Sequence, residues 1–248
     1  MGFAELHFHL LPGVDDGPPS IEESVELARM AAADGTRTIV ATPHVNGYYG
    51  LDVGTLPERT GEIAERLRRE GVPIDVLCGG ELAPERVGSL SRRELDSIAQ
   101  GPPGRRWLLL EAPLTGLDHI FSTAADELRG RGFAVVVAHP ERALAQLESG
   151  WPVLERELRA GSAIQLNAWS LAGVNGERAR EIAFQLLRAW PLVAVASDAH
   201  GPERMPSMRL AIAVLEDAGE RDPGRFVATA PAALLEQGLP ARTPAVAA

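Results

Sequence analysis

The sequence predicts one α/β domain in which parallel β-strands alternate with α-helices. Short, nearly continuous apolar runs rich in Val, Ile and Leu recur along the chain, and a helical stretch follows each of them. Such runs are typical of parallel strands that are covered on both faces. Neither a Ser/Gly linker nor a shift in composition divides the 248 residues, a length that βα barrels reach as single domains. The strands therefore form either a closed barrel or an open sheet.

The elements follow in order along the chain. The strands are predicted at 5–11, 38–44, 74–81, 106–113, 134–141, 163–170 and 191–200. The first helix begins at Ser20, which forms a capping box with Glu23, and it ends at Gly35. Further helices are predicted at 57–70, 91–99, 117–130, 151–160, 176–189, 205–218 and 223–237. The barrel domain is thus expected over 1–238, with a frayed tail over 239–248.

Composition limits the classes of function. Hydrophobic residues make up 45% of the chain, enough for a large core, and no apolar run approaches the ~20 residues that cross a membrane. The formal net charge of -10 argues against binding to nucleic acid. Cys78 is the one cysteine, so an intrachain disulfide is impossible and we expect a reducing, cytoplasmic location.

Histidines and carboxylates gather where the predicted strands end. The first strand contains His7 and His9, which point to one face because strand side chains alternate. Asp15 and Asp16 lie in the turn beyond it. The other strand ends, apart from the sixth with its Asn167, contribute His44, Glu81, Glu111, His139, Asp198 and His200. In a βα barrel all of these ends meet at one mouth, where active sites lie.

This concentration of carboxylates predicts bound cations. Unpaired, the carboxylates would repel one another and would be costly to desolvate. Any one histidine here is more often a structural residue, but their joint placement favours a metal cluster. The ligands suit about three divalent metal ions, with water or substrate completing each shell. Mixed nitrogen and oxygen ligands admit manganese, iron, zinc or cobalt, and we favour manganese.

Several segments resemble one known family. In order from residue 7 to residue 200 they read HFHLLPGVDDGP, TIVATPH, GGEL, LLLEAP, VVVAHPER, LNAWSLAG and ASDAH. This combination resembles the PHP-superfamily phosphoesterases, and within them the bacterial capsule and exopolysaccharide tyrosine-protein phosphatases (the CpsB/CapC/YwqE-like group). The resemblance implies a PHP fold, which is a distorted, TIM-like seven-stranded (β/α) barrel, and a site for three metals.

The resemblance also implies how the ligands are shared. One metal would be held by His7, His9, Glu81 and Asp198. A second metal, bridged to the first by Glu81, would also bind Glu111 and His139. The third would be held by Asp16, His44 and His200. Asp16 is preferred to Asp15 because it matches the second aspartate of the family's DDG motif, a choice that the sequence alone leaves open.

The chemistry that follows is phosphate ester hydrolysis. A water that bridges two metals loses a proton near neutral pH, and the resulting hydroxide can attack phosphorus in line. Arg142 and Arg204 are candidate phosphate clamps, because planar guanidinium groups bind phosphate through two hydrogen bonds. The aromatic side chains of Tyr48, Tyr49 and Trp169 could line a pocket for an aryl group. No general acid is assigned, although Glu203 is a candidate.

The resemblance implies a protein-tyrosine phosphatase whose partner is a bacterial tyrosine kinase that controls polysaccharide export. The alternatives are a small-molecule phosphatase of the histidinol-phosphate type, a non-catalytic barrel that binds metal or phosphate, and a polymerase-associated exonuclease, which the acidic charge disfavours. A cysteine phosphatase is excluded, because Pro84 stands six residues after Cys78 where that class needs arginine. His119 lies within a predicted helix and is expected to be structural or exposed.

Overall fold

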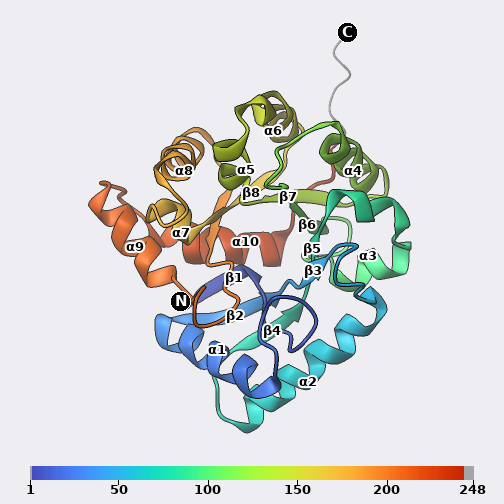
Figure 1. The fold of residues 1–248 in the computed structure, drawn as a ribbon, viewed down its shortest axis with the longest axis vertical. Coiled ribbons are helices and arrows are strands. Elements are labelled where there is room, and N and C mark those ends of the chain that lie inside the picture. The colour runs from blue at the N-terminus through green and yellow to red at the C-terminus, as the bar shows by residue number, and fades with distance from the viewer. Residues whose placement is uncertain (1, 243–248) are drawn as a thin grey trace.

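Parallel strands form a closed ring surrounded by helices in the computed structural model, which describes residues 2–242 (Figure 1). The strands are β1 (Phe3–Phe8), β2 (Thr36–Ala41), β3 (His44–Val45), β4 (Asp75–Cys78), β5 (Glu81–Leu82), β6 (Trp107–Glu111), β7 (Ala134–Ala138), β8 (Ala163–Asn167) and β9 (Val193–Ala196). They pair in the orders β1-β2-β4 and β3-β5-β6-β7-β8-β9, and every pairing is parallel.

Two predicted strands are each interrupted once. The run at 38–44 is divided into β2 and β3 at Thr42 and Pro43, and the run at 74–81 into β4 and β5 at Gly79 and Gly80. Pro43 has no N–H to donate to a sheet, which explains the first break. The two runs remain paired, because the Gly79 N–H donates to the Ala41 carbonyl at 2.9 Å. Each divided run therefore occupies one strand position in the ring.

The ring closes between its first and last strands. The His9 N–H donates to the Ala199 carbonyl at 2.9 Å, and the Asp198 N–H donates to the His7 carbonyl at 3.1 Å. The predicted α/β barrel of parallel strands is confirmed. Because these bonds join the ends of β1 and β9, they also fix three predicted metal ligands, His7, His9 and Asp198, relative to one another.

Most helices surround the ring, and one helix, α10 (Ala230–Gln237), lies across its middle in this view (Figure 1). The others are α1 (Ile21–Asp34), α2 (Leu56–Arg69), α3 (Arg92–Ile98), α4 (His119–Gly130), α5 (Pro140–Gln146), α6 (Trp151–Arg159), α7 (Ala168–Leu171), α8 (Glu177–Ala189) and α9 (Met208–Asp217). The predicted ends of α1 are confirmed: the Ser20 side chain accepts from the Glu23 N–H, and Gly35 ends the helix at φ 112°. The Glu23 carboxylate accepts from the Ser20 hydroxyl at 3.2 Å, so only one of the two bonds of the predicted capping box is formed. None of these helices is both long and apolar enough to cross a membrane.

Two short helices, α5 and α7, were not predicted. They begin inside the runs at 134–141 and 163–170, whose last residues we expected to be extended. Pro140 occupies the first turn of α5, where its missing N–H costs nothing. The Asn167 side chain caps α7 by accepting from the Trp169 N–H at 2.9 Å. The prediction was wrong here because both the strand and the helix after it are apolar, so hydropathy does not mark the boundary.

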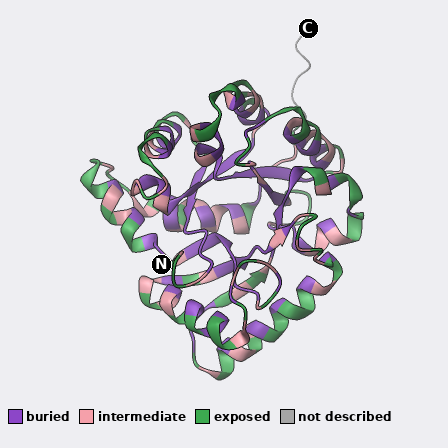
Figure 2. Ribbon diagram, in the orientation of Figure 1, coloured by how far each residue is buried: buried purple, intermediate pink, exposed green. Residues whose placement is uncertain are grey.

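The core has one layer outside the strands and one inside the ring. Strand residues are buried almost throughout, apart from β4, whose residues are half-buried or exposed (Figure 2). At the amino ends of the strands, Leu234 of α10 and Leu239 pack against Trp107, whose Nε1 donates to the Leu234 carbonyl at 2.8 Å. This end of the ring is therefore closed. Of the predicted frayed tail, Leu239 is buried, and residues 243–248 lie outside the described part of the chain.

The break between β4 and β5 needs a glycine at position 79. A Cβ atom at Gly79 would lie 2.5 Å from Cγ1 of Val40 and 3.1 Å from the Ala41 carbonyl oxygen. We therefore expect Gly79→Ala to lower the free energy of unfolding by about 1–3 kcal/mol, the usual cost of overpacking. Gly47→Ala is the control, because its Cβ would meet no atom within 4 Å. Equal denaturant midpoints for the two variants would contradict this expectation.

Candidate metal centre

Two fully buried imidazoles, His7 on β1 and His9 directly after it, form the base of the site. His7 and His9 alternate with Phe8, so both rings point into the ring of strands. Their Nε2 atoms lie 3.2 Å apart. Two nitrogens at this separation can bind the same cation, which needs both of them as neutral imidazoles.

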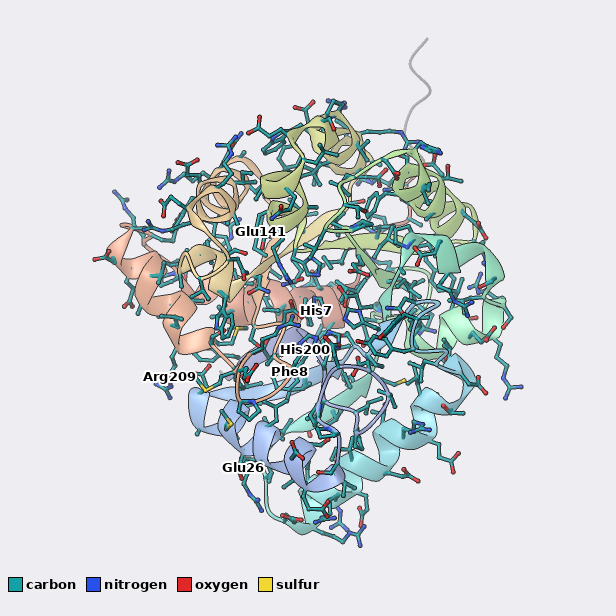
Figure 3. All side chains as sticks on the ribbon, viewed as in Figure 1. His7, Phe8, Glu26, Glu141, His200 and Arg209 are labelled. Carbon is teal, nitrogen blue, oxygen red and sulfur yellow. The ribbon has the colours of Figure 1, made fainter. Side chains whose placement is uncertain are left out.

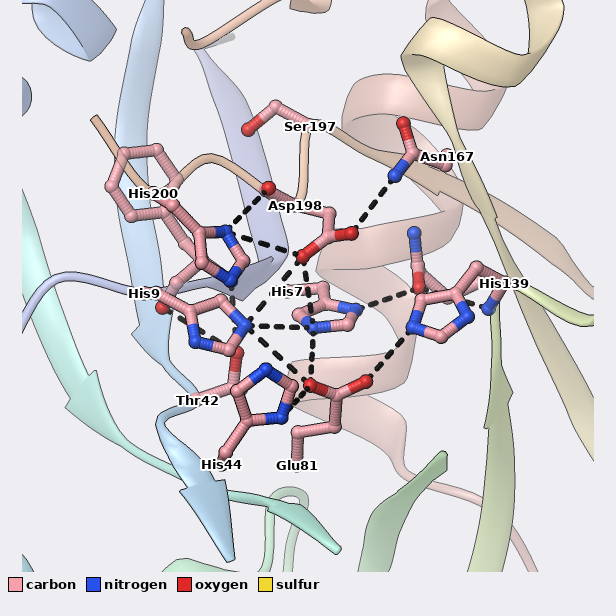
Figure 4. Close-up of polar contacts among 12 residues, drawn as sticks. His7, His9, Thr42, His44, Glu81, His139, Asn167, Ser197, Asp198 and His200 are labelled. Carbon is pink, nitrogen blue, oxygen red and sulfur yellow. Dashed lines mark hydrogen bonds and ion pairs between the residues drawn. The ribbon is translucent and has the colours of Figure 1, made fainter. Parts of the chain in front are cut away.

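Glu81 lies at the centre of the histidines (Figure 4). Its Oε2 is 3.2 Å from Nε2 of His7, 3.5 Å from Nε2 of His9 and 2.9 Å from Nδ1 of His44. Its Oε1 is 2.8 Å from Nε2 of His139. One carboxylate thus faces imidazoles on opposite sides, which is the arrangement required of a bridging ligand.

Asp198 turns its two oxygens to different partners. Its Oδ1 faces Nε2 of His7 at 3.4 Å and Nε2 of His9 at 3.5 Å. Its Oδ2 accepts from Arg142 at 3.0 Å and from Arg204 at 2.7 Å. Nδ2 of Asn167 also donates to Oδ2, at 3.0 Å (Figure 4). One oxygen is therefore free for a metal while the other orients two arginines.

The backbone is strained at two of the candidate ligands. Among residues 2–242, His139 and Asp198 are the only residues other than glycine with positive φ, at 33° and 54°. This conformation is uncommon for residues with a Cβ, and it concentrates at functional sites. Here it turns the chain sharply after β7 and β9, so that both side chains enter the ring.

A second group of ligands lies nearer the mouth. Oδ1 of Asp16 is 3.4 Å from Nε2 of His44 and 3.4 Å from Nε2 of His200. The His200 ring stacks on the His9 ring with centroids 3.6 Å apart, so this outer group adjoins the inner one. Asp16 is the most exposed of the three side chains, which places it on the solvent side.

The donor set fits metal ions. Four sets have donor atoms within 4.8 Å of one another: His9, Asp16, His44 and His200; His7, His9 and Asp198; His7, Glu81 and His139; and His44, Glu81 and Glu111. Together these sets contain all nine residues that the sequence indicated. Nδ1 of His44 and Nε2 of His200 contact the carboxylates of Glu81 and Asp16 at 2.9 and 3.4 Å without the geometry of a hydrogen bond, so both nitrogens are free to bind a cation. Glu111 groups with His44 here rather than with His139, and the division of ligands among individual metals stays a prediction.

Without cations, protons occupy part of the cluster. Burial disfavours the imidazolium of His7, but the carboxylates of Glu81 and Asp198 outweigh it and raise the pKa to about 9. The pKa of His44 is also raised to about 9, because Glu81 overcomes its burial. Burial and the nearby Glu81 raise the pKa of Glu111 to about 7. By contrast, burial and the neighbouring His9 lower the pKa of His200 to about 4, so this imidazole is neutral and ready to coordinate.

Two polar residues that orient the ligands were not predicted in that role. Oδ2 of Asp15 lies 2.7 Å from Nδ1 of His9 and also accepts from the His44 N–H at 2.9 Å. Oε1 of Gln165 lies 2.9 Å from Nδ1 of His7. Each contact leaves Nε2 of the histidine pointing at the carboxylates, as supporting residues do in metal sites. A signal existed for Gln165, which precedes Asn167 by two residues on β8 and so shares its face.

We expect Asp15→Ala to weaken metal binding by about 10–100-fold, the usual effect of losing a carboxylate that orients a histidine ligand. Titration of the metal-free protein with manganese measures this directly. Asp75→Ala, which removes an exposed carboxylate at the start of β4, is the control. Unchanged affinity in Asp15→Ala would show that His9 needs no support from this residue.

The remaining candidates differ in position. The Tyr49 ring lies parallel to the His44 ring with centroids 5.8 Å apart, whereas Tyr48 is 86% exposed. Trp169 is half-buried in α7, and His119 is exposed at the start of α4. Cys78 is half-buried, and its burial raises the pKa of the thiol, which disfavours a thiolate nucleophile. Only Tyr49 among these aromatic residues contacts the cluster directly.

The fold and the site together define a parallel βα barrel that carries a candidate multinuclear metal centre at the carboxyl ends of its strands. The sequence matches the family described as "Capsular polysaccharide synthesis, CpsB/CapC" over residues 3–236. The chain therefore belongs to the CpsB/CapC family.

Relatives agree with this assignment. Tyrosine-protein phosphatase YwqE of Bacillus subtilis is 33% identical over 199 residues, which are 79% of this chain and 76% of the relative. Tyrosine-protein phosphatase CpsB of Streptococcus pneumoniae is 24% identical over 210 residues, 82% of this chain and 84% of the relative.

Solved structures give the same result. A crystal structure from work on YwqE of B. subtilis and CpsB of S. pneumoniae, described as unique metal-dependent tyrosine phosphatases, superposes with a TM-score of 0.79. It is 27% identical and covers 97% of each chain. The phosphotriesterase homology protein of Escherichia coli superposes with a TM-score of 0.59 over 91% of this chain and 95% of its own. At 14% identity, that likeness shows the fold alone.

Proposed function

We propose that this chain, a metal-dependent tyrosine-protein phosphatase of the CpsB/CapC family, removes phosphate from a bacterial tyrosine kinase linked to capsular or exopolysaccharide synthesis. The observation that carries the proposal is the convergence of nine nitrogen and oxygen ligands on Glu81 and its neighbours, next to two arginines. We further propose that about three divalent ions bind there, with manganese favoured. Divalent ions bound here would supply Lewis acidity and lower the pKa of a coordinated water.

The arginines would hold the phosphoryl group. Arg142 and Arg204 both donate to Oδ2 of Asp198, at 3.0 and 2.7 Å, which fixes their guanidinium groups beside the cluster. A guanidinium has five N–H donors, so each arginine can keep this bond and still donate to a phosphoryl oxygen. Asn167 holds the same carboxylate oxygen in place and therefore acts as a positioning residue.

The charge of the site suits a phosphate dianion. About three divalent ions carry more positive charge than the carboxylates of Asp16, Glu81, Glu111 and Asp198 carry negative charge. The loaded pocket would therefore be positive within an acidic protein, and the two arginines add to this. Tyrosine is a favourable leaving group, because its pKa of about 10 lies well below that of an aliphatic alcohol. Cleavage at phosphotyrosine consequently needs less proton donation than cleavage at phosphoserine.

The test is phosphate release from a phosphotyrosine peptide by the purified, manganese-loaded protein. We expect turnover that chelation abolishes and manganese restores, and we expect histidinol phosphate to be hydrolysed at least about tenfold less efficiently. Faster turnover of histidinol phosphate would support the small-molecule alternative. If the loaded protein leaves phosphotyrosine intact, the proposed function fails.

Arg142→Ala should raise KM for a phosphotyrosine peptide by about 10–100-fold, since a hydrogen bond to a charged group contributes about 1.5–3 kcal/mol. Metal content should stay that of the wild type, because the arginine offers no ligand. Arg93→Ala removes an exposed arginine of α3 and serves as the control. Loss of metal from Arg142→Ala would instead assign the arginine to the support of Asp198.

A further inference from the structure

A groove opens directly beside the metal cluster. It has a volume of about 320 Å³ and lies between the turn that follows β1, the first half of α1 and the loop that follows β9. The inner end of the groove is formed by Asp16 and His200 of the candidate metal centre and by Arg204 of the arginine pair. His200 is buried, and its Nε2, which lies 3.4 Å from Oδ1 of Asp16, makes no hydrogen bond within the described chain. The groove is therefore continuous with the place where a phosphoryl group would bind.

The floor of the groove is apolar. Leu27 is buried beneath it, and Met30 and Pro18 also line it. The residues next to a phosphotyrosine in a polypeptide stay close to it, because consecutive Cα atoms are about 3.8 Å apart. With the phosphoryl group at the cluster, the residues on either side of the tyrosine lie within reach of this groove. Apolar parts of those side chains can cover its floor.

The rim of the groove is acidic. Glu23, Glu26 and Glu203 line it, whereas the single lining arginine, Arg204, is already bound to Asp198 at 2.7 Å. Glu26 lies 3.7 Å from Arg29 in a pair that is exposed on both sides, and such pairs contribute little and exchange readily. Figure 3 shows Glu26 on α1 and His200 in the centre of the molecule. The net negative charge of the rim complements lysine or arginine.

We propose that this groove binds the residues that flank the phosphotyrosine and selects substrates with lysine or arginine there. The inference rests on the proposed phosphatase function and adds a substrate preference to it. The long apolar stems of lysine and arginine can lie along the floor while their charged ends reach the glutamates. The same rim disfavours acidic segments, which gives the site a means of rejecting partners as well as of choosing them.

The experiment compares two phosphotyrosine peptides that differ only at the positions next to the tyrosine, lysine in one and glutamate in the other. We expect the wild-type protein to favour the lysine peptide at least about fivefold in kcat/KM, a ratio typical of a few exposed charge contacts. Glu26→Lys should lower this ratio about threefold or more. In 1 M salt the preference should largely disappear, since the Debye length then falls to about 3 Å.

Glu22→Lys is the matched control. Glu22 and Glu26 lie on the same helix, their side chains are 69% and 67% exposed, and each pairs with an arginine, at 3.5 and 3.7 Å. Glu22 does not line the groove, so its reversal should leave the ratio unchanged. Melting temperatures of both variants verify that they fold.

A wild-type ratio near one, or equal ratios in Glu22→Lys and Glu26→Lys, would overturn the proposed selection while leaving phosphatase activity in place. Free phosphotyrosine separates this result from failure of the proposed function. If the loaded wild-type protein hydrolyses free phosphotyrosine but shows no peptide preference, only the groove inference fails. If it hydrolyses neither free phosphotyrosine nor either peptide, the function fails and the inference with it.

Discussion

Glu81→Gln is expected to abolish phosphatase activity, with kcat/KM lowered by at least about a thousandfold, or about 4 kcal/mol of transition-state stabilisation. The two oxygens of Glu81 face His7, His9, His44 and His139 at 2.8–3.5 Å, so this carboxylate is the common partner of four imidazoles. Glutamine keeps the shape but removes the charge and places an amide NH₂ where an oxygen ligand is needed. Elemental analysis should therefore find fewer metal ions per chain, alongside the loss of turnover.

Two controls make the result specific. Glu85→Gln neutralises an exposed glutamate of the short helical segment Pro84–Ser89 and should keep full activity. Cys78→Ser should also keep it, because the thiol pKa is raised by burial and the reaction does not use a cysteine nucleophile. If Glu81→Gln retained both its metals and its turnover, the cluster around this residue would not be the reaction centre.

The position of the site could be predicted from the sequence because it depends on two regular features. Side chains alternate along a strand, which puts His7 and His9 on one face, and parallel strands of a barrel end at the same mouth. Any ligand at a strand end is then near every other, even when the strand itself is short, as at Glu81 in β5. This argument selects eight of the nine residues found together in the structure, whereas the choice of Asp16 over Asp15 depends on the family resemblance.

The details that could not be predicted depend on the backbone at single residues. Asp15 and Asp16 are neighbours of the same type, and only the course of the turn decides that Asp15 contacts Nδ1 of His9 while Asp16 faces His200. The positive φ values of His139 and Asp198 are likewise set by tertiary contacts. Hydropathy carries no information on such turns, which is also why the starts of α5 and α7 were missed.

The metal-free protein is expected to become less stable as pH rises from 7 to 9. Folding raises the pKa of His7 and of His44 from 6.5 to about 9, so their stabilising contribution is complete below pH 6.5 and is lost as pH rises through 9. Burial raises the pKa of Glu5 from 4.5 to about 8, so its protonated form is also lost in this range. Folding lowers the pKa of His139 and of His200, which makes stability rise with pH. This opposite contribution is confined to the range below pH 6.5.

The size of this effect is large for so few groups. One pKa unit corresponds to about 1.4 kcal/mol, so the titration of His7, His44 and Glu5 should together lower the free energy of unfolding by roughly 2–5 kcal/mol. For a domain of this size, that corresponds to a fall of about 5–15 °C in melting temperature. Thermal unfolding in the presence of a chelator, at pH 7 and at pH 9, measures it.

Manganese should oppose this pH dependence. Cations bind neutral imidazoles and ionised carboxylates, so protons on His7, His44 and Glu111 compete with the metals, and this competition weakens as pH rises. Stabilisation by a ligand grows with its affinity for the folded state, so the manganese-induced rise in melting temperature should be greater at pH 8 than at pH 6. A chelated protein whose melting temperature stays level from pH 7 to pH 9 would show that these imidazoles are not protonated in the empty cluster. A manganese shift that is equal at pH 6 and pH 8 would show that they are not bound to metal in the full one.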